Sequence, residues 1–183
     1  MKILSFKFYA VICFIACFTS VRAQGLSADE IKTQLVKEWE RAKAYTLEYL
    51  EAMPAGGYDF KPNDSIRSFA GQMLHLAQAN AFLVFNATDR ARPTFAGFNI
   101  ERSRGAQSKD SVKYYVTKSY DYSIEAVKNL DINQLGEKKK IFGLEETRFA
   151  LLLKAFEHQT HHRGQSTIYF RVQGMKPPDE KLF

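Results

Sequence analysis

The stretch "FEHQTHHRGQSTIYF", residues 156–170, holds three of the four histidines of this 183-residue chain. His158 and His162 are four positions apart, and on an α-helix this separation turns the side chain by only about 40° and rises about 6 Å. Both imidazoles would therefore lie on one face, one turn apart, at a spacing that allows two histidines to bind one metal ion. His161 falls on a stripe of charged residues, so we expect it at the rim of such a site or on the surface.

The helical stripe that passes through His158 and His162 is apolar at both ends and polar only in its middle. Its other members are Leu151, Ala155, Gln165, Tyr169 and Val172. A stripe of this kind faces a core, where buried imidazoles need partners. A metal ion would satisfy them, and so would a hydrogen-bonded polar layer that fixes the helix register. The fourth histidine, His75, lies in another apolar segment among small neighbours, so it can converge with the pair and leave a metal position open.

Apolar periodicity along the chain predicts four long helices, and no strand alternation competes with them. The first begins at Ser27, where Ser-Ala-Asp-Glu forms a capping box, and ends before Pro54. The other three are expected from near Ser65 to Ala87, from near Ser108 to Leu130, and from near Leu144 to Gln173. Four helices of this length predict an all-α fold, a four-helix bundle with one long connection between its second and third helices.

The first 23 residues predict a secretory signal peptide, because they open with lysines, continue with an apolar run and end in small residues at Ala23. Residues 24–183 would then form the bundle domain. A membrane anchor is the alternative, although the apolar run is short for a bilayer span. A lipoprotein site at Cys17 is a minor third possibility. We therefore expect an exported protein, periplasmic or secreted, without a stable membrane span after cleavage.

Both cysteines, Cys13 and Cys17, lie inside the predicted signal, so the mature chain would have no disulfide and any metal site must use His, Asp or Glu. Cleavage would also remove two lysines and one arginine and lower the formal net charge from +6 to +3. The remaining charges are mixed in sign, and the run Lys138–Lys140 is expected in a solvated loop. This charge pattern argues against nucleic acid as a partner. A small-molecule substrate is expected instead, and a homodimer is compatible with a bundle.

Two segments resemble the DinB/YfiT-like superfamily of metal-dependent proteins. They are "SFAGQMLHLAQAN", which contains His75, and "HQTHHRGQSTIYFRVQGMKPP", which matches the family pattern of a His, three residues and then His-Arg-Gly-Gln. The segment "YDFKPNDSIRSF" also resembles the family's approach to its first metal histidine. The resemblance covers the chain from about Ser27 to Pro178. It implies a four-helix bundle in which His75, His158 and His162 bind a divalent metal ion, zinc or nickel, with water completing the coordination.

The resemblance is compatible with three functions. We favour a metal-dependent hydrolase of unknown substrate, with metal-bound water as the nucleophile. A metal-dependent thiol (S-)transferase is the first alternative, although the low-molecular-weight thiols that such relatives use are cytoplasmic. A non-catalytic module that binds a metal or a small molecule is the second alternative.

The residues around the predicted ligands suggest further roles. Gln165 lies one turn beyond His162, where it either orients a ligand or substrate or only packs, and Gln72 is a weaker candidate for the same role. Arg163 is expected to pair with a carboxylate, and Gly164 to permit close helix approach. No Asp or Glu stands out as a general base, since Glu157 points about 100° away from His158.

Overall fold

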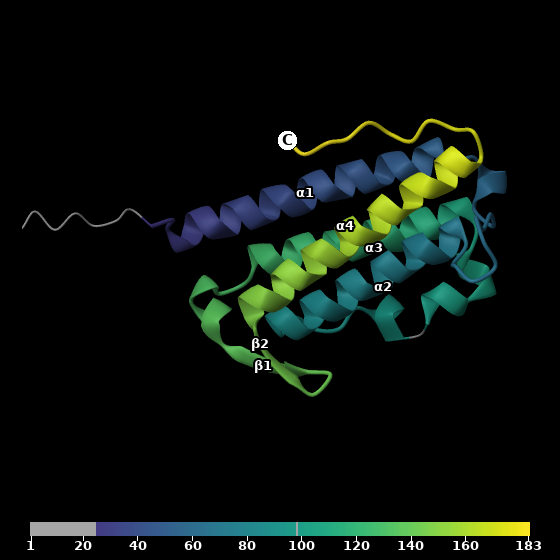
Figure 1. Ribbon diagram of the computed structural model, residues 1–183. Helices are drawn as coiled ribbons and strands as arrows, with labels where there is room; N and C mark the ends of the chain where they lie inside the picture. The colour runs from purple at the N-terminus through teal and green to yellow at the C-terminus, as the bar shows by residue number, and fades with distance from the viewer. Residues whose placement is uncertain (1–24, 98) are drawn as a thin grey trace, which may run out of the picture.

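The computed structural model describes residues 25–97 and 99–183, so the predicted signal peptide lies outside the described part of the chain. The regular elements are α1 (Ala28–Ala52), α2 (Phe69–Thr88), α3 (Lys109–Lys128), β1 (Lys138–Ile141), β2 (Leu144–Thr147) and α4 (Arg148–Val172). Short 3-10 helices fill the connections: η1 (Ala55–Gly57), η2 (Thr94–Gly97), η3 (Ile100–Arg102), η4 (Arg104–Ala106) and η5 (Ile132–Gly136). The predicted all-α four-helix bundle is confirmed, with one small hairpin added (Figure 1). None of the described helices is both long and apolar enough to span a bilayer.

Helix α2 is the centre of the bundle. It packs most extensively against α4 and α3, whereas α1 packs mainly against α3. Edge-to-face aromatic contacts join the helices: Trp39 of α1 meets Tyr120 of α3 and Phe156 of α4, with ring centroids 5.9 and 5.5 Å apart. Phe69 of α2 meets Phe170 of α4 at 5.8 Å. This packing fixes α2 against α4, the two helices that carry the predicted metal ligands.

The helix starts follow local capping. The capping box of α1 is formed as predicted, with the Glu30 amide donating to Ser27 Oγ at 3.2 Å and the Ser27 amide donating to Glu30 Oε2 at 2.7 Å. Helix α2 begins four residues later than expected, after Ser68 rather than near Ser65. The reason is local, because Ser65 donates its amide and hydroxyl hydrogens to Asn63 Oδ1 in a turn. Ser68 instead accepts from the Gly71 amide and caps the helix.

The expectation that the fourth helix begins near Leu144 and that Lys138–Lys140 lie in a solvated loop is wrong. These residues form the antiparallel hairpin of β1 and β2, in which Lys139 faces Glu146 and Lys140 faces Glu145. Opposite charges on facing residues stabilise such a pair. Helix α4 starts only after Thr147, whose hydroxyl accepts from the Ala150 amide. Four-residue strands made mostly of charged residues carry too little alternation to predict a hairpin.

Candidate metal centre

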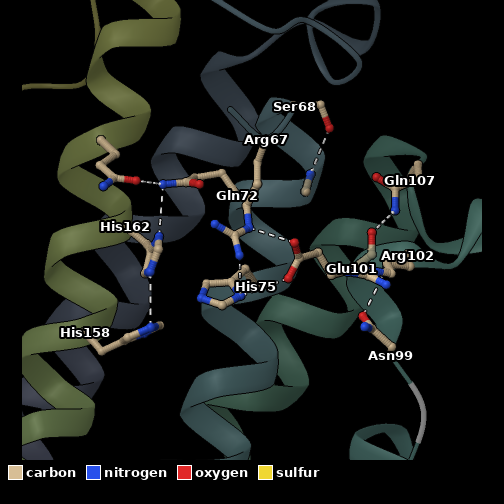
Figure 2. A network of polar contacts seen from close by, with 12 residues as sticks. Arg67, Ser68, Gln72, His75, Asn99, Glu101, Arg102, Gln107, His158 and His162 are labelled. Atoms are coloured by element: carbon tan, nitrogen blue, oxygen red, sulfur yellow. Dashed lines mark hydrogen bonds and ion pairs between the residues drawn. The ribbon is translucent and has the colours of Figure 1, made fainter. Parts of the chain in front are cut away.

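Three histidines from two helices meet at one point. His75 comes from α2, His158 and His162 come from α4, and one potential ligand atom of each lies within 4.8 Å of the others. The Nε2 atoms of His158 and His162 are 3.1 Å apart, and the His75 ring centroid lies 4.6 Å from that of His162. Figure 2 shows the three rings turned toward one another between the helices. The chain therefore brings together the three residues that the sequence singles out.

Burial keeps the two imidazoles of α4 uncharged. Burial, together with the nearby His75, lowers the pKa of His158 to about 4. Burial and the adjacent His158 lower the pKa of His162 to about 3. Near neutral pH both side chains are therefore neutral, which is the form in which imidazole offers a lone pair to a metal ion.

Glu101, which the sequence did not suggest, orients His75. Its Oε2 lies 2.9 Å from His75 Nδ1, and its Oε1 accepts from Arg67 Nε at 2.7 Å (Figure 2). Burial alone would raise the pKa of Glu101, but the hydrogen bonds from Arg67 and His75 lower it below its ordinary value. Arg67 Nη2 also lies 3.3 Å from His75 Nδ1, but the carboxylate oxygen is nearer and accepts a hydrogen bond from Nδ1. Nε2 of His75 then keeps its lone pair, the arrangement found behind many metal-binding histidines.

The loop that carries Glu101 is itself fixed. Glu101 lies in η3, where the Gln107 side chain donates to its carbonyl at 2.9 Å and Asn99 accepts from the Arg102 amide. Ile100, next to Glu101, is fully buried against the core. Glu101 sits in the long connection between α2 and α3, far in sequence from every histidine and outside any periodic segment. No pattern in the sequence could therefore have assigned it to the site.

A second chain of polar contacts leads from His162 to the surface. Gln72 Nε2 lies 3.0 Å from His162 Nδ1, and Gln72 also contacts Gln165 Oε1. Gln165 Nε2 in turn lies 2.7 Å from Nε2 of His161, which is exposed as predicted. Gln72 is thus the amide in direct contact with the triad, and Gln165 acts only through it. This reverses the order of importance that the sequence suggested for the two glutamines.

The direction of these hydrogen bonds depends on which ring nitrogen of His162 carries the proton. When Gln72 donates to His162 Nδ1, His162 carries its proton on Nε2 and can donate it to His158 Nε2. For Nε2 of His162 to offer a lone pair instead, the proton must lie on Nδ1 and Gln72 must accept it through its amide oxygen. Gln165 must then donate to Gln72 and accept from His161. The two amides can meet this demand by turning over together, because the oxygen and nitrogen ends of an amide have nearly the same shape.

The three histidines fit a divalent metal ion in their chemistry. They supply three neutral nitrogen ligands, a set that zinc and nickel accept. The Nδ1 atom of His158 is buried and has no hydrogen-bond partner among the described residues. The Nε2 atoms of His158 and His162 lie 3.1 Å apart, a separation at which one bound ion could contact both.

Arg163 and Gly164 do not behave as expected. Arg163 is buried, lies with its guanidinium 4.5 Å from the centre of the Tyr45 ring and donates to Gln159 Oε1 at 2.7 Å. Within the described chain it makes no ion pair with a carboxylate, so the predicted pairing is wrong. Its charge is stabilised instead by an aromatic face and oxygen acceptors. Gly164 is exposed and has no neighbour near its missing Cβ, so it does not serve close helix approach.

Comparison with known proteins agrees with this architecture. The fold is similar to the crystal structure of a DinB-like protein from Bacillus cereus ATCC 10987, with a TM-score of 0.70 and 17% identity over 81% of this chain and 97% of that one. It is also similar to a DinB-like protein from Bacillus subtilis, with a TM-score of 0.65 and 20% identity over 80% of this chain and 96% of that one. No curated protein matches the sequence. The family model of the DinB family matches residues 26–181. The chain belongs to the DinB family.

Proposed function

We propose that this protein is an exported metal-dependent hydrolase whose divalent ion, zinc or nickel, is held by His75, His158 and His162. The observation that supports the proposal is the convergence of three imidazoles on one point between α2 and α4. Structural zinc sites usually have four protein ligands, whereas three ligands leave a position for water or substrate. A bound divalent ion would supply Lewis acidity, which polarises a carbonyl group and lowers the pKa of coordinated water.

The chain's own residues would prepare the ligands. The Glu101 carboxylate, held by Arg67, keeps the proton of His75 on Nδ1. Gln72 does the same for His162 when its amide oxygen faces Nδ1. Three neutral imidazoles add no negative charge, so an ion bound by them would keep most of its Lewis acidity. Hydrolysis is preferred over thiol transfer because water is available to an exported protein, whereas the thiols that such transferases use are cytoplasmic.

Metal analysis tests the first half of the proposal. The purified mature protein, reconstituted separately with zinc, nickel and manganese, should bind one equivalent of at least one of these ions. His158→Ala and His162→Ala should retain no stoichiometric metal after removal of the free ion, whereas Glu157→Ala, which alters an exposed neighbour on the same helix, should bind the normal amount. Failure of the unmodified protein to bind any of the three ions in stoichiometric amount would refute the metal site and the hydrolase together.

A substrate screen tests the second half. The metal-loaded protein should hydrolyse members of a panel of esters and amides without any added thiol, and the histidine variants should not. Turnover of thiol conjugates only when a low-molecular-weight thiol is added would identify a transferase instead. Stoichiometric metal without turnover of any substrate in the panel would favour the non-catalytic module.

Export is tested by fractionation. The mature protein should be found in the periplasm or the medium, with Gln24 as its first residue, as cleavage after Ala23 requires. Recovery of the chain from the cytoplasm with its first 23 residues still attached would contradict this part of the proposal.

A further inference from the structure

A pocket of about 300 Å³ opens beside the three histidines. His75 and His158 form one end of it, and its other lining residues are Gln78, Ala79, Phe82, Leu83, Arg92 and Phe142. Since His75 and Phe82 are separated by about two turns of α2, the pocket extends roughly 10 Å from the imidazoles. Its volume is at the small end of the range for ligand pockets, so it suits a small molecule.

The lining has a definite chemical character. Its walls are mainly apolar, formed by Ala79, Phe82, Leu83 and the ring of Phe142. Arg92 is the only arginine, lysine, aspartate or glutamate among the described lining residues. Such a lining favours a molecule with an apolar body and a negatively charged group.

The conformation and position of Phe142 indicate that this pocket binds a ligand. It occupies the tip of the hairpin with φ 50°, followed by Gly143 with φ 82°, so both turn residues have positive φ. Asn or Asp is the usual first residue of such a turn, and a bulky aromatic residue there is unfavourable. The side chain is also 82% exposed, yet its ring lies 5.5 Å from the ring of Phe82. An exposed aromatic ring held in an unfavourable turn conformation over a pocket points to contact with a ligand.

The hairpin is fastened so that this ring stays over the pocket. Lys139 of β1 pairs with Asp89, at the end of α2, at 2.8 Å. Arg148, which follows β2, also pairs with Asp89 and donates to the Ala87 carbonyl at 3.0 Å. Figure 1 shows the hairpin running beside α2. The tip is therefore positioned by the same helix that carries His75 and Phe82.

We infer that this pocket binds small aryl- or alkyl-carboxylates, with the apolar body between Phe82 and Phe142, the carboxylate at Arg92 and the reacting group at His75 and His158. The inference rests on the proposed function, because it places the bond to be cleaved at the histidine end. It narrows the substrate to amphiphilic esters or amides that also carry a free carboxylate.

Equilibrium binding to the zinc-loaded protein, measured by calorimetry, tests this inference without requiring turnover. The probes are 4-phenylbutanoate, its neutral amide 4-phenylbutanamide, and acetate. Phenylbutanoate should bind about tenfold or more tightly than acetate, because only it buries a phenyl group. It should also bind several-fold more tightly than the amide, because only it carries the charge that complements Arg92.

Two variants assign these preferences to residues. Phe142→Asn replaces the ring with a residue suited to the turn, so the hairpin should stay folded while the advantage of phenylbutanoate over acetate falls about tenfold. Leu144→Thr, which changes an exposed hairpin residue outside the pocket, should leave that advantage unchanged. Arg92→Gln should abolish the preference for phenylbutanoate over its amide.

Equal binding of phenylbutanoate and acetate to the unmodified protein, or equal effects of Phe142→Asn and Leu144→Thr, would overturn the apolar site. A carboxylate preference that survives in Arg92→Gln would place the anionic group at the histidines and overturn the role of Arg92. These outcomes are separable from failure of the proposed function. Binding of phenylbutanoate as expected without hydrolysis of any ester or amide would support the pocket and contradict the hydrolase. Hydrolysis by a protein with no preference for the phenyl group would support the hydrolase and contradict the pocket.

Discussion

Two polar pairs occupy adjacent positions on α4 and face different sides of the helix, about 100° apart. The histidine face, His158 and His162, points toward α2, and the arginine face, Gln159 and Arg163, points toward α1 and α3. Both pairs have the same four-residue spacing, and both are largely buried. They differ in whether their polar atoms have hydrogen-bond partners. That difference distinguishes a candidate metal site from a structural contact.

The arginine face is a closed hydrogen-bonded cluster. Gln159 Oε1 accepts from Tyr120 Oη at 2.8 Å and from Arg163 Nη1 at 2.7 Å, and the Tyr120 hydroxyl contacts Thr46 Oγ1 at 2.7 Å. These groups come from α1, α3 and α4, so the cluster fixes how the three helices align. A buried hydrogen-bonded network of this kind rigidifies a core. The histidine face, in contrast, leaves His158 Nδ1 without a partner within the described structure and borders a pocket.

The largest effect is expected on the histidine face. His158→Ala should weaken zinc binding by more than about 100-fold, since removal of residues that only support a ligand already costs about 10–100-fold. The free energy of unfolding of the metal-free protein should change by no more than about 1 kcal/mol, because the side chain borders a pocket. Metal titration and urea unfolding measure the two quantities. A loss of several kcal/mol of stability in the metal-free variant would mean that the histidines form a structural polar layer.

The neighbouring residue should behave in the opposite way. Gln159→Ala removes the acceptor shared by Tyr120 and Arg163, so it should lower the free energy of unfolding by about 2–3 kcal/mol because buried donors are left unsatisfied. Zinc affinity should be unchanged as long as the protein is folded. Urea unfolding together with zinc titration at low denaturant tests both statements. Normal stability in this variant would show that the arginine face contributes nothing to the alignment of the helices.

A smaller effect is expected from the group behind His75. Glu101→Ala should weaken zinc binding by about 10–100-fold, because His75 then loses the carboxylate that fixes its tautomer. Glu101→Gln should restore part of the affinity, since its amide oxygen can still accept from Nδ1. The exposed Glu157→Ala is the matched control and should bind zinc normally. Equal zinc affinity of Glu101→Ala and Glu157→Ala would exclude an orienting role for Glu101.

The smallest effect is expected at Gly164, which belongs to neither face. Gly164→Ala should raise the free energy of unfolding by about 0.5–1 kcal/mol, because alanine restricts the unfolded chain and no atom lies within 4 Å of the added Cβ. Zinc binding should not change. Thermal unfolding at matched protein concentration measures the gain. A destabilised variant would show that close approach at this glycine matters after all.

Local sequence patterns are sufficient to predict the four helices and the histidine pair on α4. Each helix is encoded by local periodicity and caps, as the box formed by Ser27 and Glu30 shows. The spacing of His158 and His162 places both rings on one face of any α-helix. The separation of His161 from them follows from the same geometry. These features depend on residues within a few turns of one another, which is why a linear reading finds them.

The groups that surround the histidines depend on tertiary contacts. Glu101 reaches His75 from a loop without periodicity, Gln72 rather than Gln165 touches His162, and Arg163 packs on an aromatic ring instead of a carboxylate. The hairpin places Phe142 over the pocket although its short charged strands gave no strand signal. Each of these contacts joins segments far apart in the chain. Their formation depends on how the helices pack, and packing depends on the combined burial of many side chains rather than on any local pattern.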